Sequence, residues 1–307
     1  MLFQRGIIHL LAMTACLSAS GPAASQADEM DEPGLSIEED KGYQVNANEV
    51  KNEKVWGGTR VKPGSYPAIV GVTRRGSRQI LCTGTLIAAD LVLTAAHCVC
   101  GAINGTVVFA DEEGTGTSIK VSASRHALRS CEGSLTDGHD LGVLLLSSAT
   151  NVTPVEVQLD DIVQGAKSYQ VVGFGDFGRD ASGELTAGEK RETVVPSATN
   201  DCVGKLPTVN RSYSAAFGCA PGNEIVAGKA GLGLDSCNGD SGGPIMTDPA
   251  GKGVAAGQSG STLKIAGVTS RATKSAKRPC GDGGIYVRLN PTARAWIAAA
   301  SEQMRKK

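Results

Sequence analysis

One short glycine-rich run, residues 235–244 with the sequence DSCNGDSGGP, constrains this chain of 307 residues more than any other segment. It places Ser241 among glycines. Glycine reaches backbone angles that other residues adopt only at a cost, so such a loop can aim successive N–H groups at one point. Two N–H groups aimed at a developing alkoxide form an oxyanion hole, and each donor is worth about 10²–10³ in rate. The run predicts a serine nucleophile for acyl transfer, and the fold has to bring a base to it.

A base and a partner for it are found upstream. Of the four histidines, His97 follows an apolar stretch that begins at Leu91, and Asp140 opens a second apolar stretch that runs to Leu146. A carboxylate at the mouth of a buried strand needs a polar partner, and an imidazole N–H can supply one. The order of the three candidates along the chain is therefore His, Asp, Ser.

These three strings resemble the His, Asp and Ser motifs of the trypsin/chymotrypsin family of serine endopeptidases, and the resemblance extends from about Val55 to the C-terminus. It implies an all-β fold: two packed six-stranded antiparallel β-barrels with a C-terminal helix, and a barrel boundary at roughly residues 150–165. The site would lie between the barrels, with His97 and Asp140 from the first and Ser241 from the second.

The chemistry and the resemblance assign the same roles. Ser241 Oγ attacks the scissile carbonyl, His97 takes and returns its proton, and Asp140 orients His97 and stabilises the imidazolium. The N–H groups of Gly239 and Ser241 would bind the oxyanion. His139, next to Asp140, is expected to face the other side of the extended segment.

Asp235, six residues before the nucleophile, resembles the base of the trypsin S1 pocket. An anion at the floor of a narrow apolar slot favours a guanidinium or an ammonium and leaves neutral side chains with an unpaired charge. Cleavage after Arg or Lys is therefore predicted. Gly284 matches the small residue that keeps such a pocket open. Ser270, which can bond Asp140, and Ala272 complete the predicted substrate-binding set.

Three positions depart from the family pattern. Arg271 replaces the usual aromatic residue of the subsites upstream of the cut, and Ala272 replaces a glycine, so its methyl group would narrow the S1 entrance. Phe174 stands where tryptophan is common, a difference that concerns core packing.

The first 54 residues lie before the region that resembles the family, and they have two parts. Residues 1–27 are typical of a signal peptide, which predicts secretion to the extracellular space or the periplasm. Their apolar run is shorter than the ~20 residues that span a bilayer. A lipid anchor on Cys16 is an open alternative. Residues 28–54 are acidic and polar, as expected for a flexible propeptide.

The sequence at Lys54 and Val55 resembles the family's activation site, where a cut frees a new N-terminus. The ammonium of Val55 would insert beside Asp240, and removing one partner of a buried charge pair is strongly destabilising. We therefore expect a zymogen with residues 55–307 as the peptidase domain. Because Lys54 suits a pocket with Asp235, the mature enzyme is expected to activate its own precursor.

Nine cysteines without Cys16 leave eight, an even number that is consistent with an oxidising compartment. Their spacing alone does not fix the connectivity. The resemblance implies three pairs and leaves a fourth: Cys82–Cys98, Cys202–Cys219, Cys237–Cys280 and, as the remaining pair, Cys100–Cys131. No zinc-like spacing occurs, so no metal is expected, and no cofactor either.

The charge balance argues against one class of partner. The chain has 30 basic and 31 acidic residues, and residues 1–54 hold 4 and 9 of them, which leaves the rest with 26 and 22 and a net charge of +4. That is too small to indicate nucleic-acid binding. We expect a monomer without a transmembrane span, acting on protein or peptide substrates with Arg or Lys and open to proteinaceous inhibitors. Two alternatives remain: a protease-like binding or regulatory protein without turnover, and an esterase with the same triad.

Short apolar runs at residues 68–72, 170–174 and 264–268 predict strands, because each is bounded by turn-forming residues. The one helical signal begins at Pro291, with Asn290 as its cap and basic residues at its C-terminal end. Its Trp296 and Ile297 are expected to pack on the second barrel.

Overall fold

The computed structural model describes most of the region that shows the resemblance. The described residues are 56–100, 105–128, 131, 134–157, 163–176, 178–179, 185–254 and 262–306. The predicted signal peptide and propeptide, Cys16, Lys54 and Val55 lie outside them. All of the described residues belong to one of the chain's two units, Asn48–Lys307.

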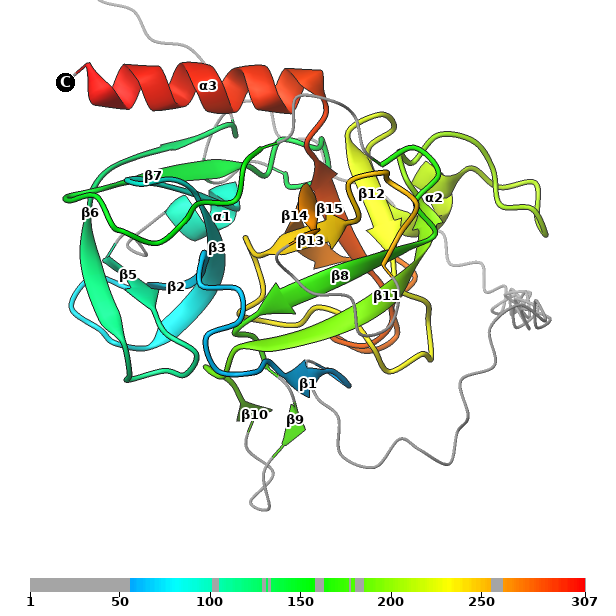
Figure 1. Ribbon diagram of the computed structural model, residues 1–307. Coiled ribbons are helices and arrows are strands. Elements are labelled where there is room, and N and C mark those ends of the chain that lie inside the picture. Colours follow the sequence, from blue (N-terminus) through cyan, green and yellow to red (C-terminus); the bar gives the residue numbers. More distant parts are fainter. Residues whose placement is uncertain are drawn as a thin grey trace, which may run out of the picture. The chain divides into compact units, whose positions relative to one another are not determined.

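Six antiparallel strands close the first barrel (Figure 1, blue to green). In hydrogen-bonded order they are β2 (Ile69–Thr73), β3 (Ile80–Ala88), β4 (Leu91–Thr94), β7 (Gly142–Leu146), β6 (Thr117–His126) and β5 (Thr106–Phe109). β2 and β4 are buried along their whole length, which explains why their sequences are apolar runs rather than alternating patterns. Val72, Leu86 and Leu144 are fully buried in its core. Each such side chain stabilises the fold by roughly 1.5–3 kcal/mol.

Six further strands close the second barrel: β8 (Ser168–Gly173), β11 (Arg191–Thr199), β12 (Glu224–Ala227), β15 (Gly284–Arg288), β14 (Lys264–Ala272) and β13 (Pro244–Thr247). The ring closes because β8 pairs with both β11 and β13. β1 (Thr59–Arg60) adds to β11, and β9 (Gly178–Arg179) pairs with β10 (Leu185–Thr186). Tyr169, Ile245 and Tyr286 are fully buried in this core. The predicted fold of two six-stranded antiparallel barrels is confirmed.

Among the described residues, three helices accompany the barrels: α1 (Ala96–Val99), α2 (Tyr213–Phe217) and α3 (Pro291–Arg305). α3 begins where the sequence predicts. The Asn290 side chain accepts a hydrogen bond from the Ala293 N–H at 2.9 Å, a cap that contributes ~1 kcal/mol. The two shorter helices were not predicted, because about one turn carries no apolar period. In the described part of the chain, no helix is both long and apolar enough to cross a membrane.

α3 packs differently from the expectation. Trp296 and Ile297 were expected on the second barrel, but α3 contacts β6 and β7 of the first barrel (Figure 1, red helix). Ile297 lies in an apolar cluster that holds Val143 of the first barrel and Val287 of the second. The helix therefore follows the second barrel in sequence and covers the first one in space.

Candidate active site

His97 and Asp140 meet at one end of the first barrel. α1 begins directly after β4 and carries His97, while Asp140 lies just before β7, the strand that pairs with β4. His97 Nδ1 lies 2.8 Å from Asp140 Oδ2, and the His97 backbone N–H donates to Asp140 Oδ1 at 3.0 Å. The carboxylate is fully buried, whereas the imidazole is 29% exposed. Since Nδ1 is engaged, Nε2 is the ring atom that remains for a reacting group.

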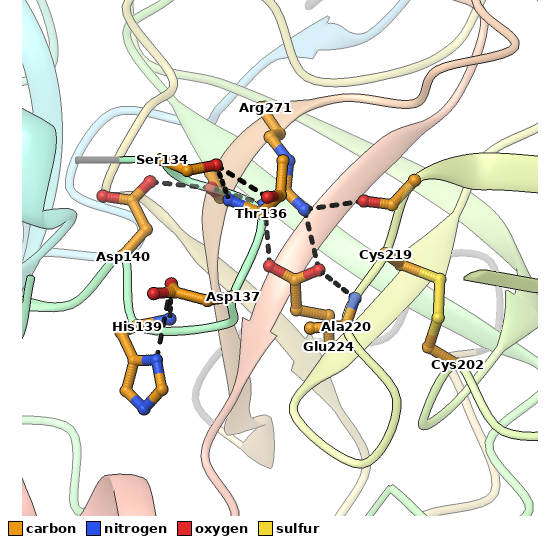
Figure 2. A network of polar contacts seen from close by, with 12 residues as sticks. Ser134, Thr136, Asp137, His139, Asp140, Cys202, Cys219, Ala220, Glu224 and Arg271 are labelled. Carbon is orange, nitrogen blue, oxygen red and sulfur yellow. Dashed lines mark hydrogen bonds and ion pairs between the residues drawn. A yellow bond between two sulfur atoms is a disulfide. The ribbon is translucent and has the colours of Figure 1, made fainter. Parts of the chain in front are cut away.

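Hydrogen bonds keep the buried Asp140 charged. Burial alone would raise the pKa of Asp140, but hydrogen bonds from His97 and from Ser270 outweigh that effect and hold the pKa below its usual value. The Ser270 hydroxyl donates to Asp140 Oδ2 at 2.7 Å. His139 turns away and contacts Asp137 at 3.3 Å, so it takes no part in this cluster (Figure 2).

Ser241 lies close to His97 because β3 and α1 hold its loop. The Ser241 carbonyl oxygen accepts a hydrogen bond from the Thr83 N–H at 2.8 Å and lies 3.5 Å from Cys98 Sγ. A ring nitrogen of His97 lies within 4.8 Å of the same sulfur. Gly242 has φ of +82°, and a Cβ there would collide with the end of β4. Only glycine permits this approach of the two barrels.

The backbone N–H groups of the serine loop alternate between engaged and unengaged. Those of Asp240 and Gly242 donate to backbone carbonyls at 3.0 and 2.9 Å. Within the described residues, the N–H groups of Gly239 and Ser241 have no acceptor. Two unengaged donors that flank one residue of a loop form the arrangement that an oxyanion requires.

The direction of the Gly239 N–H is set by its own peptide group. The carbonyl of that peptide belongs to Asn238 and accepts a hydrogen bond from the Asp176 N–H at 2.7 Å. In a trans peptide the N–H points opposite to the carbonyl, so it faces away from Asp176. The Gly239 carbonyl is held in turn by the Thr83 hydroxyl at 2.8 Å.

Asp240 is buried behind this loop. Its carboxylate accepts hydrogen bonds from the N–H groups of Cys237 and Gly175, both at 2.8 Å. Burial raises the pKa of Asp240 to about 7 in spite of these bonds. A Cβ on Gly173 or Gly175 would collide with the carboxylate. Among the described residues, no basic side chain pairs with it.

Asp235 is the second buried acid of this region, with 2% of its surface exposed. It accepts hydrogen bonds from Tyr286 Oη at 3.1 Å and, more weakly, from Ser236 Oγ at 3.4 Å. Burial raises its pKa to about 7. A Cβ on Gly284 would lie 3.0 Å from Asp235 Oδ1, so glycine leaves the space beside the carboxylate open. Ala272 pairs with Gly284 across β14 and β15 and is exposed.

Arg271 turns toward a buried acid instead of the site surface. Its Nη1 and Nη2 donate to the two carboxylate oxygens of Glu224 at 2.7 and 2.8 Å (Figure 2). Nη2 also donates to the Gly218 carbonyl at 3.0 Å. Glu224 is fully buried and accepts a further hydrogen bond from the Ala220 N–H at 2.7 Å. The charge of Arg271 is therefore neutralised inside the second barrel.

A family model for trypsin matches residues 55–297, which is most of the chain. The chain belongs to the trypsin family. At this level it is a serine protease. It is 29% identical to a trypsin-like protease of Streptomyces glaucescens over 223 residues, which cover 69% of this chain and 74% of that protein. It is 26% identical to a trypsin of Saccharopolyspora erythraea over 240 residues, which cover 76% and 92%.

The family also has a longer relative in human. Serine protease 56 of Homo sapiens is 31% identical over 200 residues, which cover 62% of this chain. The chain spans only 31% of the length of that protein.

The described part of the chain holds four disulfides, and they join the cysteines named in the sequence analysis: Cys82–Cys98, Cys100–Cys131, Cys202–Cys219 and Cys237–Cys280. The first ties β3 to α1 beside His97, and the last ties the serine loop to the segment that precedes β15. Each typically stabilises by ~2–4 kcal/mol. The sulfurs near His97 are bonded to one another and are not available as metal ligands.

Two residues of the site were missed by the sequence analysis. Thr83 holds both Gly239 and Ser241, and its only signal was its place next to Cys82. Glu224 opens the otherwise apolar strand β12. An acidic residue at the start of an apolar strand indicates that its carboxylate has a buried polar partner, but the sequence does not identify that partner.

Proposed function

We propose that this trypsin-family chain is a secreted serine endopeptidase that is made as a zymogen and cleaves peptide bonds after Arg or Lys. The observation that carries the proposal is the pair of unengaged N–H groups at Gly239 and Ser241, on the loop that lies beside His97. A structural serine turn has no need for such donors. A nucleophile that generates an oxyanion needs both.

The reaction follows from these positions. Ser241 Oγ bonds to the scissile carbonyl carbon while His97 Nε2 accepts the hydroxyl proton. The carbonyl oxygen becomes an oxyanion bound by the two N–H groups, and Asp140 stabilises the imidazolium. His97 then protonates the leaving amine as the C–N bond breaks, which leaves an acyl-enzyme. A water molecule, deprotonated by His97, hydrolyses this ester and restores Ser241.

Specificity for basic side chains is supported by the burial of Asp235. Its carboxylate has no cationic partner among the described residues, and Gly284 keeps the adjacent space open. A guanidinium or ammonium that enters there pairs with a desolvated anion. A neutral side chain leaves this anion unpaired, and that cost separates basic from neutral substrates.

The zymogen is supported by Asp240. The carboxylate is fully enclosed, its pKa is raised by burial, and it lacks a cation among the described residues. An ammonium released by a cut between Lys54 and Val55 would satisfy this charge and stabilise the serine loop. By the same reasoning, the active form would begin at Val55.

Chromogenic amides of Arg, Lys, Phe and Ala test the proposal, with Ser241→Ala as the inactive control. Turnover confined to Arg and Lys supports it. No turnover by protein that starts at Val55 points to a protease-like binding protein, and hydrolysis of esters without amides points to an esterase. A preference for Phe would refute the role of Asp235.

A further inference from the structure

Ser270 and Arg271 are consecutive in β14, yet Arg271 Nη1 lies 3.3 Å from Ser270 Oγ. Consecutive side chains of a regular strand point to opposite faces of the sheet. β14 has a β-bulge here: Thr269 pairs with Tyr286 and Arg271 pairs with Ile285, so Ser270 has no partner on β15. A bulge re-aims side chains, and this one brings a guanidinium against a hydroxyl.

The contact with Arg271 determines the direction of the Ser270 proton. A serine hydroxyl has one proton to donate and two lone pairs that accept. The guanidinium has donors only, so Nη1 occupies a lone pair of Ser270 Oγ at 3.3 Å. The proton then goes to the nearest acceptor, Asp140 Oδ2 at 2.7 Å. In this way the orientation of one hydroxyl is fixed from both sides.

The guanidinium is fixed by the buried carboxylate behind it. Its two-pronged pair with Glu224, at 2.7 and 2.8 Å, sets both position and plane (Figure 2). The Gly218 carbonyl accepts a further hydrogen bond from Arg271, and the Ala220 N–H donates one to Glu224. Since Arg271 is 16% exposed and Glu224 is 0% exposed, solvent competes little with these bonds.

We propose that the Glu224–Arg271 pair is a positioning device for the catalytic group. It holds the Ser270 hydroxyl on Asp140, and Asp140 in turn holds His97 as the general base. The inference rests on the proposed function. Arg271 acts through Ser270 and is therefore a positioning residue.

A double-mutant cycle tests this route of action. The pair variant carries both Glu224→Gln and Arg271→Gln, so that no single buried charge is left without its partner. Its activity is compared with that of Ser270→Ala and with that of the triple variant, which carries all three changes. We expect kcat to fall about tenfold in the pair variant, as for loss of a hydrogen bond to a charged group, with KM little changed. The acid limb of kcat/KM should also move, because Asp140 loses a donor and its negative charge then acts more strongly on His97.

Non-additivity is the decisive outcome. If the pair acts through Ser270, the triple variant should lose no more activity than Ser270→Ala alone. If the activity loss of the triple variant equals the product of the losses in the pair variant and in Ser270→Ala, the inference is wrong. A matched pair variant, Arg305→Gln with Asp90→Asn, removes an ion pair between α3 and the β3–β4 turn that touches no site residue, and it should leave both kcat and the pH profile unchanged.

A measurement without turnover separates this inference from the proposed function. The NMR signal of the proton between His97 and Asp140 should shift equally in the pair variant and in Ser270→Ala. If wild type hydrolyses no amide and these shifts agree, the proposed function fails and the positioning role stands. If wild type cleaves Arg amides while the pair variant keeps its kcat, pH profile and proton signal, the positioning role fails and the proposed function stands.

Discussion

The Thr83 hydroxyl in β3 donates a 2.8 Å hydrogen bond to the Gly239 carbonyl and so ties the first barrel to the serine loop of the second. The same oxygen accepts from the Phe174 N–H at 3.1 Å. The Thr83 N–H holds the Ser241 carbonyl at 2.8 Å. A single residue thus fixes the serine loop at two points, Gly239 and Ser241, and ties it to Phe174 after β8.

Thr83→Val keeps the shape of the side chain and removes its hydroxyl. The part-buried Gly239 carbonyl and the buried Phe174 N–H lose their partner, so urea unfolding should show a loss of about 1–3 kcal/mol. kcat should fall as well, because Gly239 is no longer held. Thr73→Val is the matched control, since its hydroxyl bonds only Thr106 within the first barrel. Equal kcat values for the two variants would contradict the role of Thr83.

The two buried acids make folding stability depend on pH. Burial raises the pKa of Asp235 and Asp240 from 3.8 to about 7, so the folded state binds more protons than the unfolded state between these values. The stability of the uncut chain, in which Asp240 has no ammonium beside it, should therefore fall as the pH rises from about 4 to 7. Asp235→Asn should gain a few kcal/mol at pH 8 and nothing at pH 4, as measured by urea unfolding. Asp137→Asn, which removes an exposed carboxylate, is the control for the loss of one acidic side chain.

Selectivity should depend on pH in the same range. A basic substrate side chain binds the charged form of Asp235, whose pKa is about 7. The ratio of kcat/KM for an Arg amide to that for an Ala amide should fall below pH 7, because protonation removes the anion. Taking the ratio cancels the ionisation of His97, which both substrates need. A ratio that is constant from pH 5 to 9 would show that Asp235 does not carry the selectivity.

Activation should require a basic residue before Val55. Lys54→Gln should accumulate as an uncut, inactive precursor, as shown by N-terminal sequencing. Ser241→Ala, purified without other proteases, should also stay uncut, and a trace of active wild-type enzyme should then cut it after Lys54. Spontaneous cutting of the Ser241→Ala protein would exclude a need for self-activation.

The exposed methyl group of Ala272 should restrict the pocket entrance. Ala272→Gly removes it opposite Gly284 and should lower KM for Arg and Lys amides several-fold while kcat changes little. Ala276→Gly, in the loop that follows, serves as the control for added backbone freedom. A KM that falls equally in both variants would assign the effect to loop mobility.

The candidate site residues that carry local sequence signals were identified from the sequence alone, and their catalytic roles stay predictions. His97, Asp140 and Ser241 each stand at the edge of a short string whose apolar or glycine content is informative, and so does Asp235. The strands follow from the same kind of signal, because each is a short apolar run between turn residues.

Features that depend on register were not predictable in this way. The pairing of Arg271 with Glu224 needs β12 and β14 to lie on either side of β15, and it needs the bulge at Ser270. No local pattern encodes either condition. The docking of α3 was predicted only in part for a similar reason: its apolar face shows that it packs, but not that it contacts the first barrel as well as the second.

The position of α3 affects how the protein folds while it is being synthesised. It covers β6 and β7 of the barrel that is synthesised first, although it is itself the final element of the chain. At about 5–20 residues per second, the ribosome needs on the order of 10–30 s to proceed from the end of β7 to the end of α3. Throughout that interval the surface destined for α3 stays uncovered. A truncated product that lacks α3 would leave this apolar surface of β6 and β7 exposed. Chaperones and quality-control proteases could then bind a surface that is covered in the complete chain.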